Sequence, residues 1–512
     1  MNVTELCTLR MRGLSGKNVR MQASNWWSKR NCPVHRNYAC YDDQGLFPAT
    51  PYISSDSAIR EHCCAQLPHV LRESRVNLNC VNNINKIFGS QWLNDEELVL
   101  GTKCNGLYIC CLPNAAKRLR RLPRTGRKRD KWRRLLYRPV IGDDDPDATP
   151  PLYQCASGET LVRVPQLKCS QNSTWNTGGE DDTGASSNCG IHAVKINPSG
   201  TMLATGAEHP SDLALYTLPD FRPITVGERA HADWMFDFVW LDDQIGMSGS
   251  RDGSMAIWHF DGDRLLDETH RRACRHVPIM EVRDAHFYGT PAAQRYVTSE
   301  PRKRVFDANF SRVRALSFSD ARRQVVATSL NNRLCAVDVM TLNMKQIVDL
   351  PNYREMVCAC HNDDCSVLAV GSKLHLAFFD DRDLNVTMDV PLPSNEPHQH
   401  ERLMPAHARM MIDDRTGVRS VSWRGPLVTI GTGTSDLLFF DVRAHKFLPC
   451  TGRGCKRDLV LTAMDPWRRF DEMATTSTAI YTHCYDQNGT RIFTGGGPIT
   501  ASVQGSYAAL WQ

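Results

Sequence analysis

A short pattern that recurs seven times along the chain constrains its fold more than any other feature of the sequence. Each copy is an apolar strand, a turn of small residues and a second strand in which apolar residues alternate. In the clearest copy, Asp252 and Gly253 favour a tight turn, because glycine accepts positive φ and aspartate bonds its own backbone. The copies read LVLGTKCNGLYIC (98–110), LATGAEHPSDLALY (203–216), MSGSRDGSMAIW (247–258), VATSLNNRLCAVDV (326–339), LAVGSKLHLAFFD (368–380), VTIGTGTSDLLFFD (428–441) and IFTGGGPITASVQGSYAALW (492–511).

Another short apolar strand precedes each copy, and several of these strands end in a turn signal such as NPSG at 197–200. The second and third turns are 43 residues apart, from Gly206 to Gly249. Repeats of about 40 residues that end in tryptophan are typical of propeller blades. Seven units favour a closed ring, because closure removes exposed sheet edges. We therefore expect an all-β fold, a seven-bladed WD-repeat β-propeller.

The segments outside the repeats suggest how the chain is divided. Residues 1–55 show no clear period and are expected to be a disordered extension, whereas 56–75 predict a short amphipathic helix interrupted near Pro68. The propeller is expected over 76–512, with long insertions at 113–187, 262–310, 385–416 and 446–476. The fourth strand of a blade should follow the third, as in DRLLDETH (263–270) or HKFLPC (445–450). Residues 75–83 could supply the outer strand of the last blade and fasten the ring.

The net charge of +5 comes from one basic segment rather than from the whole chain. Residues 117–138 read KRLRRLPRTGRKRDKWRRLLYR, with twelve basic residues and one acid, so the remainder is near −6. This balance argues against a general nucleic-acid binder. The segment fits either a nuclear import signal or a solvated loop.

Composition also bears on location and cofactors. No apolar run approaches the ~18 residues that a membrane helix needs, and the N-terminus lacks the apolar core of a signal peptide. We expect a protein of the cytoplasm and nucleus without a membrane partner. The 20 cysteines include no CxxC pair, so buried thiols are expected, with no metal site and no cofactor.

Propeller topology brings two kinds of position to one face, here called the top face: the start of each innermost strand and the turn between the second and third strands. Aligning the turns on Arg251, and the innermost strands on their second residue, gives fourteen such positions. One is acidic, Glu208. Six are basic: Lys86, Lys103, Arg251, Arg314, Lys373 and Arg419.

These six residues predict an anion site. Charged turns are common on surfaces, which weakens the argument for Lys103 and Lys373, but isolated charge beside the channel is costly. Converging cations need an anionic partner, and arginine offers carboxylates a two-pronged fork. The alternative is a set of unrelated surface charges.

An aromatic-Asp-x-Arg box occurs twice, as FFDDR at 378–382 and FFDVR at 439–443. The third strand of a blade descends, so Asp380, Arg382, Asp441 and Arg443 are expected on the opposite, bottom face of adjacent blades. Each aspartate could simply cap its strand and pair with its arginine. Two adjacent copies favour a docking contact instead.

No catalytic constellation emerges from the sequence. The run GTGTSD lacks the spacing of a phosphate-binding loop. His231 is expected to join Ser250, Asp252 and Trp258 in the hydrogen-bonded brace of a WD repeat. We therefore expect no enzyme and no catalytic residue.

Together these motifs resemble the WD-repeat substrate receptors of cullin-four RING ubiquitin ligases, and among them the family of DDB-one and cullin-four associated factor twelve. The resemblance runs from about residue 64 to 512 and is interrupted at 113–187. It is carried by NKIFGSQWLN, LGTKCN, CGIHA, SGSRDGSM, FFDVRA, AIYTHCYD and the ending YAALW.

The resemblance implies a non-catalytic substrate receptor with two binding faces. The helical segment, with Leu67 and Leu71, and the two boxes would bind the ligase's triple-propeller adaptor and, through it, cullin-four. The top face would bind substrate C-termini that end in acidic residues, typically two glutamates. The residues that match the expected positions are Lys86, Lys103, Arg251, Arg314 and Arg419, whereas Lys373 follows from the alignment alone.

Two other interpretations remain open. The chain could be a scaffold outside the ligase system, whose basic ring binds phosphorylated or acidic internal segments. It could also associate with nucleic acid through residues 117–138.

Overall fold

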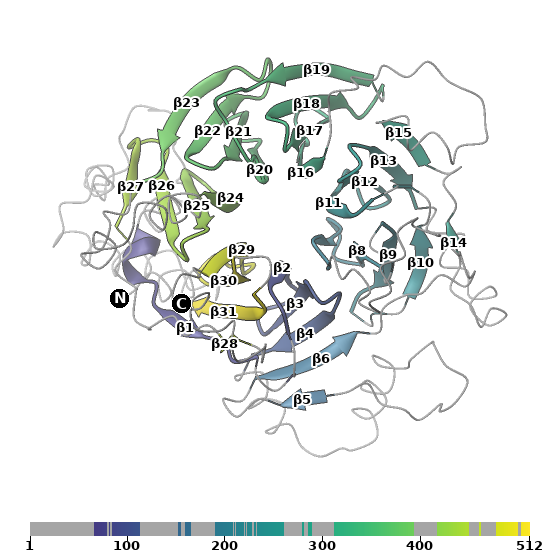
Figure 1. Ribbon diagram of the computed structural model, residues 1–512, viewed down its shortest axis with the longest axis vertical. Coiled ribbons are helices and arrows are strands. Elements are labelled where there is room, and N and C mark those ends of the chain that lie inside the picture. The colour runs from purple at the N-terminus through teal and green to yellow at the C-terminus, as the bar shows by residue number, and fades with distance from the viewer. Residues whose placement is uncertain are drawn as a thin grey trace, which may run out of the picture.

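Seven β-sheets are arranged in a ring in the computed structural model of the chain (Figure 1). The structure describes residues 66–112, 152–154, 159–164, 190–260, 279–280, 285–288, 312–393, 417–449, 460–461, 478–499 and 503–512, apart from a few single positions within these ranges. The predicted extension 1–55 and basic segment 117–138 lie outside them. The predicted all-β, seven-bladed propeller is confirmed. No helix of the described part is long and apolar enough to cross a membrane.

Each blade is built outward from an innermost strand, and the blades are numbered one to seven in chain order. The innermost strands are β2 (Ile87–Trp92), β7 (Val194–Ile196), β11 (Met235–Trp240), β16 (Val313–Ser319), β20 (Cys358–Asn362), β24 (Val418–Arg424) and β29 (Thr478–Tyr485). The second strands are β3 (Glu97–Thr102), β8 (Met202–Gly206), β12 (Ile245–Ser250), β17 (Gln324–Ser329), β21 (Val367–Gly371), β25 (Leu427–Thr432) and β30 (Ile492–Pro498). The third strands are β4 (Leu107–Cys111), β9 (Leu213–Thr217), β13 (Met255–His259), β18 (Arg333–Asp338), β22 (His375–Asp380), β26 (Leu437–Asp441) and β31 (Gly505–Trp511).

The outer strands come from varied parts of the chain. They are β6 (Thr160–Val164), β10 (Pro223–Gly227), β15 (Ala285–Tyr288), β19 (Asn343–Asp349), β23 (Val386–Pro391), β27 (Lys446–Leu448) and β1 (Glu73–Arg75). Three short strands pair beyond or beside this set: β5 (Leu152–Gln154) with β6, β14 (Ile279–Met280) with β10, and β28 (Val460–Leu461) with β31.

Several outer strands lie inside ranges predicted as insertions, so those boundaries are wrong. β23 lies within 385–416 and β27 within 446–476, while β5 and β6 lie within 113–187. In blade three, β15 takes the place expected for 263–270, which lies outside the described residues. The edge of every third strand needs a hydrogen-bonding partner, but a repeat pattern does not reveal which distant stretch supplies it.

Apolar side chains pack between neighbouring blades and form the core. Because alternate residues of a strand face opposite sides, one strand serves two interfaces. On β13, Trp258 packs with Leu215 of blade two, whereas Ile257 packs with Leu316 and Val325 of blade four. Seven such clusters are present among the described residues, one for each interface around the ring.

The second strands approach the next blade very closely. A Cβ atom at Gly249 would lie 2.5 Å from Cγ1 of Val313, and one at Gly431 would lie 2.7 Å from Cγ2 of Ile480. Both distances are too short for real Cβ contacts. Glycine is therefore required here by packing between blades.

Three tryptophans tie adjacent innermost strands together near the bottom face. The indole Nε1 of Trp92 donates to the carbonyl of Cys484 (3.1 Å), that of Trp240 to Lys195 (2.9 Å) and that of Trp423 to Cys360 (2.9 Å). In each pair the carbonyl belongs to the preceding blade. These bonds fix the position of each innermost strand relative to its neighbour.

The brace in blade three uses different serines from those predicted. The two ring nitrogens of His231 lie 2.7 Å from Ser248 Oγ and 2.6 Å from Ser254 Oγ, and Trp258 Nε1 donates to Ser248 Oγ at 2.8 Å. Ser254 in turn donates to Asp252. Ser250 bonds the carbonyl of Asp233 instead, because its side chain faces the turn and not the blade interior.

The ring closes through β1, which corrects two predictions. β1 pairs antiparallel with β31, so that Glu73 lies opposite Trp511 and Arg75 opposite Ala509. The closing strand is thus 73–75 and not 75–83, and only 66–70 of the predicted helix 56–75 are helical among the described residues. The exposed edge of β31 explains the difference, because its unpaired backbone groups are satisfied by extended chain.

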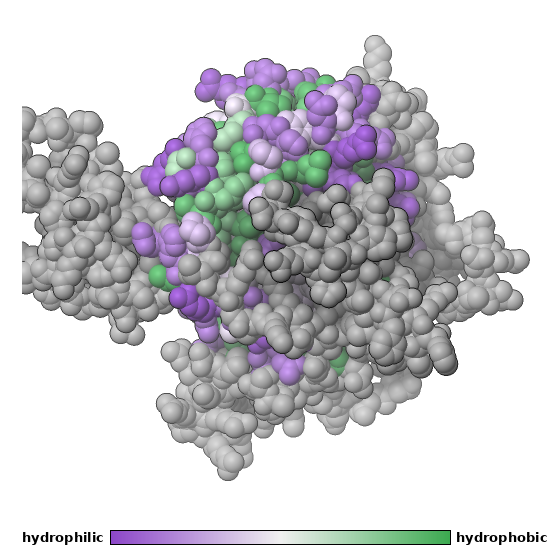
Figure 2. All heavy atoms as spheres, turned by 60° about the vertical axis from the view of Figure 1, so that its left-hand side comes forward, coloured by the Kyte–Doolittle hydropathy of each residue, from purple (hydrophilic) through white to green (hydrophobic). Residues whose placement is uncertain are grey.

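The outer wall formed by β23 and β27 has mixed polarity, with apolar side chains lying between hydrophilic ones (Figure 2). The exposed large apolar side chains among the described residues are Met340, Leu374 and Val386. Single exposed apolar residues of this kind are normal on soluble proteins. The charged and aromatic residues of the two faces are therefore the better candidates for function.

Candidate functional site

In five blades the turn between the second and third strands bonds the backbone at the start of the innermost strand, which places both at one end of the ring, the top face. The amide of Arg251 donates to the carbonyl of Trp234 (2.9 Å), and the amide of Gly433 donates to that of Gly417 (2.9 Å). The amide of Lys103 donates to the carbonyl of Lys86 at 2.8 Å. The same backbone contact therefore places these three turns at one end of the ring.

A β-bulge near the top of the innermost strand recurs in five blades. The pairing shifts between Ile87 and Gly89 in blade one, and between Met235 and Asp237 in blade three, with equivalent shifts in blades four, six and seven. A bulge leaves one residue outside the ladder and re-aims its side chain. The residues at the bulges, with those at the matching positions of blades two and five, form the set called the mouth ring: Phe88, His192, Phe236, Arg314, Val357, Arg419 and Tyr481.

The aromatic members of the mouth ring contact one another from blade to blade. Phe88 stacks on His192 with ring centroids 4.3 Å apart and an interplanar angle of 9°. Tyr481 meets Phe88 edge-on at 5.2 Å, and Phe236 meets His192 edge-on at 5.0 Å. All four side chains are partly exposed. They form a continuous arc across blades seven, one, two and three.

The two arginines of the mouth ring complete the circle. The guanidinium of Arg314 lies 4.6 Å from the ring centroid of Phe236. Burial lowers the pKa of Arg314, Asp237 opposes that shift and the positive charge of Arg419 adds to it. The two guanidiniums are thus close enough to repel each other, from blades four and six on either side of blade five.

Arg419 carries an unmet hydrogen-bonding capacity. One of its terminal nitrogens lies 3.4 Å from Glu355, yet its Nε is buried and has no hydrogen-bond partner among the described residues. The side chain is only 16% exposed. A buried donor without a partner is costly, so this nitrogen favours the approach of an acceptor. Burial raises the pKa of the neighbouring Tyr481 hydroxyl, against the opposing charges of Arg419 and Arg314.

Lys86 does not occupy the position predicted for it. The mouth-ring residue of blade one is Phe88, two residues later, and Lys86 instead matches Trp234 of blade three. The reference point of the alignment is the reason: the start of an apolar run does not mark an equivalent position in each blade, whereas the equivalent Trp92 and Trp240 match Phe88 with Phe236. Lys86 is 2% exposed, and burial, with help from Lys103, lowers its pKa to about 7. Lys86 and Lys103 therefore form a second pair of interacting cations, of which only Lys103 is partly exposed.

The remaining predicted cations lie at the rim. Arg251 pairs with Asp233 (3.6 Å) and stacks over Trp234, with its Cζ 4.8 Å from the ring centroid. Lys373 stands in the equivalent turn of blade five, where its amide donates to the carbonyl of Arg354 at 2.8 Å. Local pairing therefore accounts for part of the role of Arg251.

On the bottom face, both boxes adopt the same local structure. Asp380 accepts a hydrogen bond from the amide of Arg382 (2.8 Å), and Asp441 accepts one from the amide of Arg443 (2.9 Å). The guanidinium Nε atoms lie 4.0 Å and 3.8 Å from the same carboxylates. Each aspartate therefore caps its turn. The arginine side chains remain 69% and 49% exposed, on adjacent blades.

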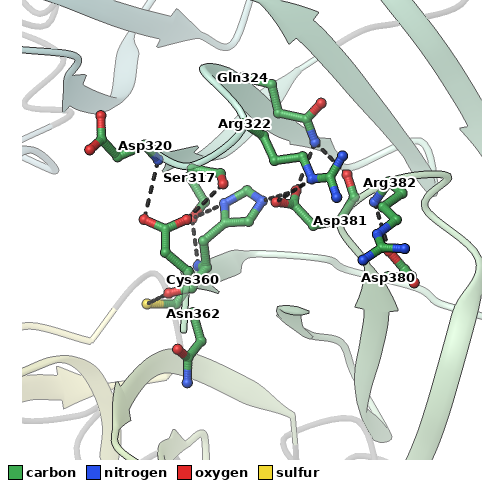
Figure 3. Close-up of polar contacts among 12 residues, drawn as sticks. Ser317, Asp320, Arg322, Gln324, Cys360, Asn362, Asp380, Asp381 and Arg382 are labelled. Carbon is green, nitrogen blue, oxygen red and sulfur yellow. Dashed lines mark hydrogen bonds and ion pairs between the residues drawn. The ribbon is translucent and has the colours of Figure 1, made fainter. Parts of the chain in front are cut away.

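A buried polar network supports the box of blade five. His361 lies 2.9 Å from Asp381 and 2.9 Å from Ser317, and the side-chain amide of Gln324 donates to Asp381 at 2.7 Å. Figure 3 shows Gln324 and Arg322 pointing toward Asp381, while Arg382 turns back to Asp380. Burial alone would raise the pKa of Asp381, but its bonds with His361, Ser319 and Gln324 lower it. No pattern in the sequence points to this network.

Leu67 and Leu71 are buried in the propeller and not presented to a partner. They are 2% and 1% exposed and pack with Phe439, Tyr507 and Trp511 between blades six and seven. Their apolar side chains stabilise the ring closure, which explains the periodicity that predicts an amphipathic helix. A direct adaptor contact by these two side chains does not fit this burial.

Sequence reasoning misses Phe88, although a signal for it exists. The tryptophans that tie the innermost strands, Trp92, Trp240 and Trp423, are equivalent in the structure. Counting back four residues from each gives Phe88, Phe236 and Arg419.

In the described part of the chain, no group of three or more histidine, cysteine, aspartate or glutamate residues could hold a metal ion.

One known protein family matches most of the chain. The model of the DDB1- and CUL4-associated factor 12 beta propeller matches residues 67–131 and 179–512. The matched ranges hold all seven innermost strands, the mouth ring and both boxes, and the gap between them falls within 113–187, where an insertion is predicted. The chain therefore belongs to the DDB1- and CUL4-associated factor 12 beta-propeller family.

Proposed function

We propose that this chain is the substrate-recognition subunit of a cullin-four ubiquitin ligase, is joined to it through a DDB1-type adaptor, and is not itself a catalyst. Membership of a family named for association with DDB1 and CUL4 supports the assembly. The chemistry of the two faces supports a division of labour, in which the top face binds substrate and the bottom face binds the adaptor.

The observation that carries substrate binding is the pair formed by Arg314 and Arg419. Two like charges are held near each other in partly buried positions, and Arg419 Nε lacks a hydrogen-bond partner among the described residues. A carboxylate between them would relieve the repulsion and accept charge-assisted hydrogen bonds. Lys86 and Lys103 supply a second cationic pair on the same face.

These cations fit the acidic C-terminus of a protein. A chain that ends in two glutamates carries three negative charges within two residues, and only a chain end can enter a narrow channel mouth without passing through it. Replacement of either glutamate would remove charge-assisted hydrogen bonds to these cations, so specificity arises from the loss of those bonds. The exposed Arg382 and Arg443 are proposed to contact the adaptor, because exposed arginines on one face favour recognition of carboxylates.

The top-face site is tested by fluorescence anisotropy with a peptide that ends Gly-Glu-Glu. Arg314→Ala and Arg419→Ala should each weaken binding by about tenfold or more, whereas Arg382→Ala, on the opposite face, should leave it intact. Wild-type affinity in both top-face variants would overturn the pocket.

The same measurement separates a chain-end reader from a general acidic-segment scaffold. A peptide in which Gly-Glu-Glu is followed by Gly-Ser-Gly should lose binding to a chain-end reader, since its acidic pair is no longer terminal. Equal affinity for both peptides would favour the scaffold. Phosphorylated internal peptides provide the positive control for that alternative.

We also propose that the protein occurs in both cytoplasm and nucleus. The support is the basic segment 117–138, whose composition fits an import signal. Deletion of these residues should exclude a fluorescently labelled chain from the nucleus, and unchanged nuclear signal would remove this support.

A further inference from the structure

The mouth ring has two opposite sides of different chemistry. Arg314, Val357 and Arg419, from blades four, five and six, form the side called the cationic pole. In a ring of seven, the boundary between blades one and two lies opposite blade five, and Figure 1 shows β2 across the central opening from β20. That boundary holds the stacked rings of Phe88 and His192, the side called the aromatic pole.

The aromatic pole is a surface and not part of the core. Phe88 and His192 lie nearly parallel, and the edges of Tyr481 and Phe236 extend the arc on both sides. Each of these side chains is partly exposed, in contrast to the apolar residues between the blades. Partly exposed rings that contact one another in a continuous arc favour coverage by another apolar surface.

A peptide end held at the cationic pole must place some of its side chains toward the aromatic pole. In an extended chain, successive side chains point to opposite sides. If the penultimate carboxylate lies between Arg314 and Arg419, then the side chain of the third residue from the end faces the other way. It would lie against Phe88 and His192.

We infer that the mouth ring also selects the residue that precedes the acidic pair, and that the preferred residue has a flat aromatic side chain; this inference rests on the proposed function. An aromatic ring at that position can stack on the exposed rings of the pole, which prefer offset-stacked and edge-on partners. Serine or glycine gains no such contact. The substrates are therefore proteins that end in an aromatic residue followed by two acidic ones.

The inference is tested by comparing the affinities of five peptides that end x-Glu-Glu, in which x is Gly, Ser, Leu, Phe or Trp. The wild-type chain should bind the Trp and Phe peptides about three- to tenfold more tightly than the Gly peptide. A sixth peptide, with Trp moved one residue further from the end and Gly at x, should not gain, because its ring points away from the aromatic pole.

Two variants assign the preference to Phe88. Phe88→Leu keeps an apolar side chain but removes the ring, so the ratio of Trp to Gly affinities should fall below about twofold, whereas Phe88→Tyr should retain the wild-type ratio. A wild-type ratio near one, a gain only in the shifted peptide, or an unchanged ratio in Phe88→Leu would each overturn the inference. If the Gly peptide binds and the ratio is one, the aromatic selection alone is wrong; if the Gly peptide fails to bind, the proposed chain-end recognition falls as well.

Discussion

The guanidinium of Arg314 lies over the ring of Phe236, with its Cζ 4.6 Å from the ring centroid. The two residues occupy equivalent bulges in adjacent blades, so the contact follows from the repeat itself. The contact holds the planar guanidinium of Arg314 in the mouth ring. Asp237, which follows Phe236 in the chain, partly offsets the free-energy cost of burying the charge of Arg314. A flat, oriented cation is therefore built into the mouth ring.

Arg314→Lys tests whether that orientation matters. Lysine keeps the charge but loses the planar contact with Phe236 and the two-pronged fork, so affinity for a peptide ending Gly-Glu-Glu should fall by about five- to thirtyfold in calorimetry. The control is Arg323→Lys, because Arg323 lies over Phe318 in a similar contact (5.3 Å) on the bottom face. Equal effects of the two changes would indicate a loss of stability and not of recognition.

The lowered pKa of Lys86 predicts that affinity for a peptide ending in two glutamates depends on pH. The pKa of this lysine in the free chain is lowered to about 7, and a bound carboxylate would raise it by favouring the charged form. Binding then takes up a proton above pH 7, so affinity should be constant below that value and fall as the pH rises from about 7 to 9. The glutamate carboxylates are ionised throughout this range.

Calorimetry in buffers of different ionisation enthalpy measures this proton uptake directly. Lys86→Met should weaken binding and reduce the uptake at pH 8. Burial also lowers the pKa of Lys103, so Lys103→Met serves as the paired variant that divides the uptake between the two lysines. Affinity that does not change between pH 7 and 9 would contradict the proposed role of both.

The bottom face predicts a separate loss of adaptor binding. The double change Arg382→Ala and Arg443→Ala removes two exposed guanidiniums from adjacent blades, and adaptor affinity should fall by about tenfold or more because arginines often dominate interfaces. The control is Arg323→Ala, also at the bottom but paired with Asp320 in blade four. Peptide binding at the top face should persist in both proteins, and an intact adaptor complex after the double change would remove the boxes from the interface.

The architecture is predictable from the sequence because each blade repeats its own turn chemistry. Asp252 and Gly253 fix one turn, and the same small-residue pattern marks the other six. The outer strands are less predictable, since β6 and β15 come from long segments between repeats. Their position depends on which stretch pairs with an open sheet edge, a tertiary effect that local pattern does not contain.

The candidate site is predictable where a residue's position follows the repeat, and less so where the start of a strand is read from its apolar run. Arg314 and Arg419 occupy equivalent bulges of blades four and six and their charges interact, whereas in blade one Phe88 and not Lys86 occupies that position. Burial is the second source of error. Leu71 belongs to a sequence pattern that predicts an amphipathic helix with its apolar face turned to a partner. In the structure its side chain is buried against residues of the same chain.

His483 predicts a loss of stability in acid. Its ring nitrogens lie 2.7 Å from Ser420 Oγ and 2.6 Å from Ser422 Oγ, and burial lowers its pKa to about 4. The unfolded chain binds a proton near pH 6.5, so this group's contribution is complete above that value and is lost as the pH falls toward 4. The loss is on the order of 2–3 kcal/mol in the free energy of unfolding.

Urea unfolding at pH 7, 6, 5 and 4.5 measures that slope. His483→Gln cannot titrate, so its stability should fall less steeply over this range, whatever its value at pH 7. The matched control is His259→Gln, at an exposed position on β13, which should keep the wild-type slope. Parallel curves for the His483 variant and the wild type would show that other groups cause the acid sensitivity.

The brace of blade three predicts different costs for two neighbouring serines. Ser248 Oγ lies 2.7 Å from a ring nitrogen of His231 and accepts from Trp258 Nε1, all within the buried blade. Ser248→Ala would leave this ring nitrogen of His231 and the indole nitrogen of Trp258 without their partner, which should lower the free energy of unfolding by about 2–4 kcal/mol. Ser250→Ala removes contacts with the carbonyl of Asp233 and the turn amide of Asp252, but it leaves His231 and Trp258 bonded to Ser248, so its cost should be smaller, about 1 kcal/mol. Urea unfolding of the two variants side by side checks the order, and a larger loss in Ser250→Ala would restore the brace that the sequence pattern alone predicts.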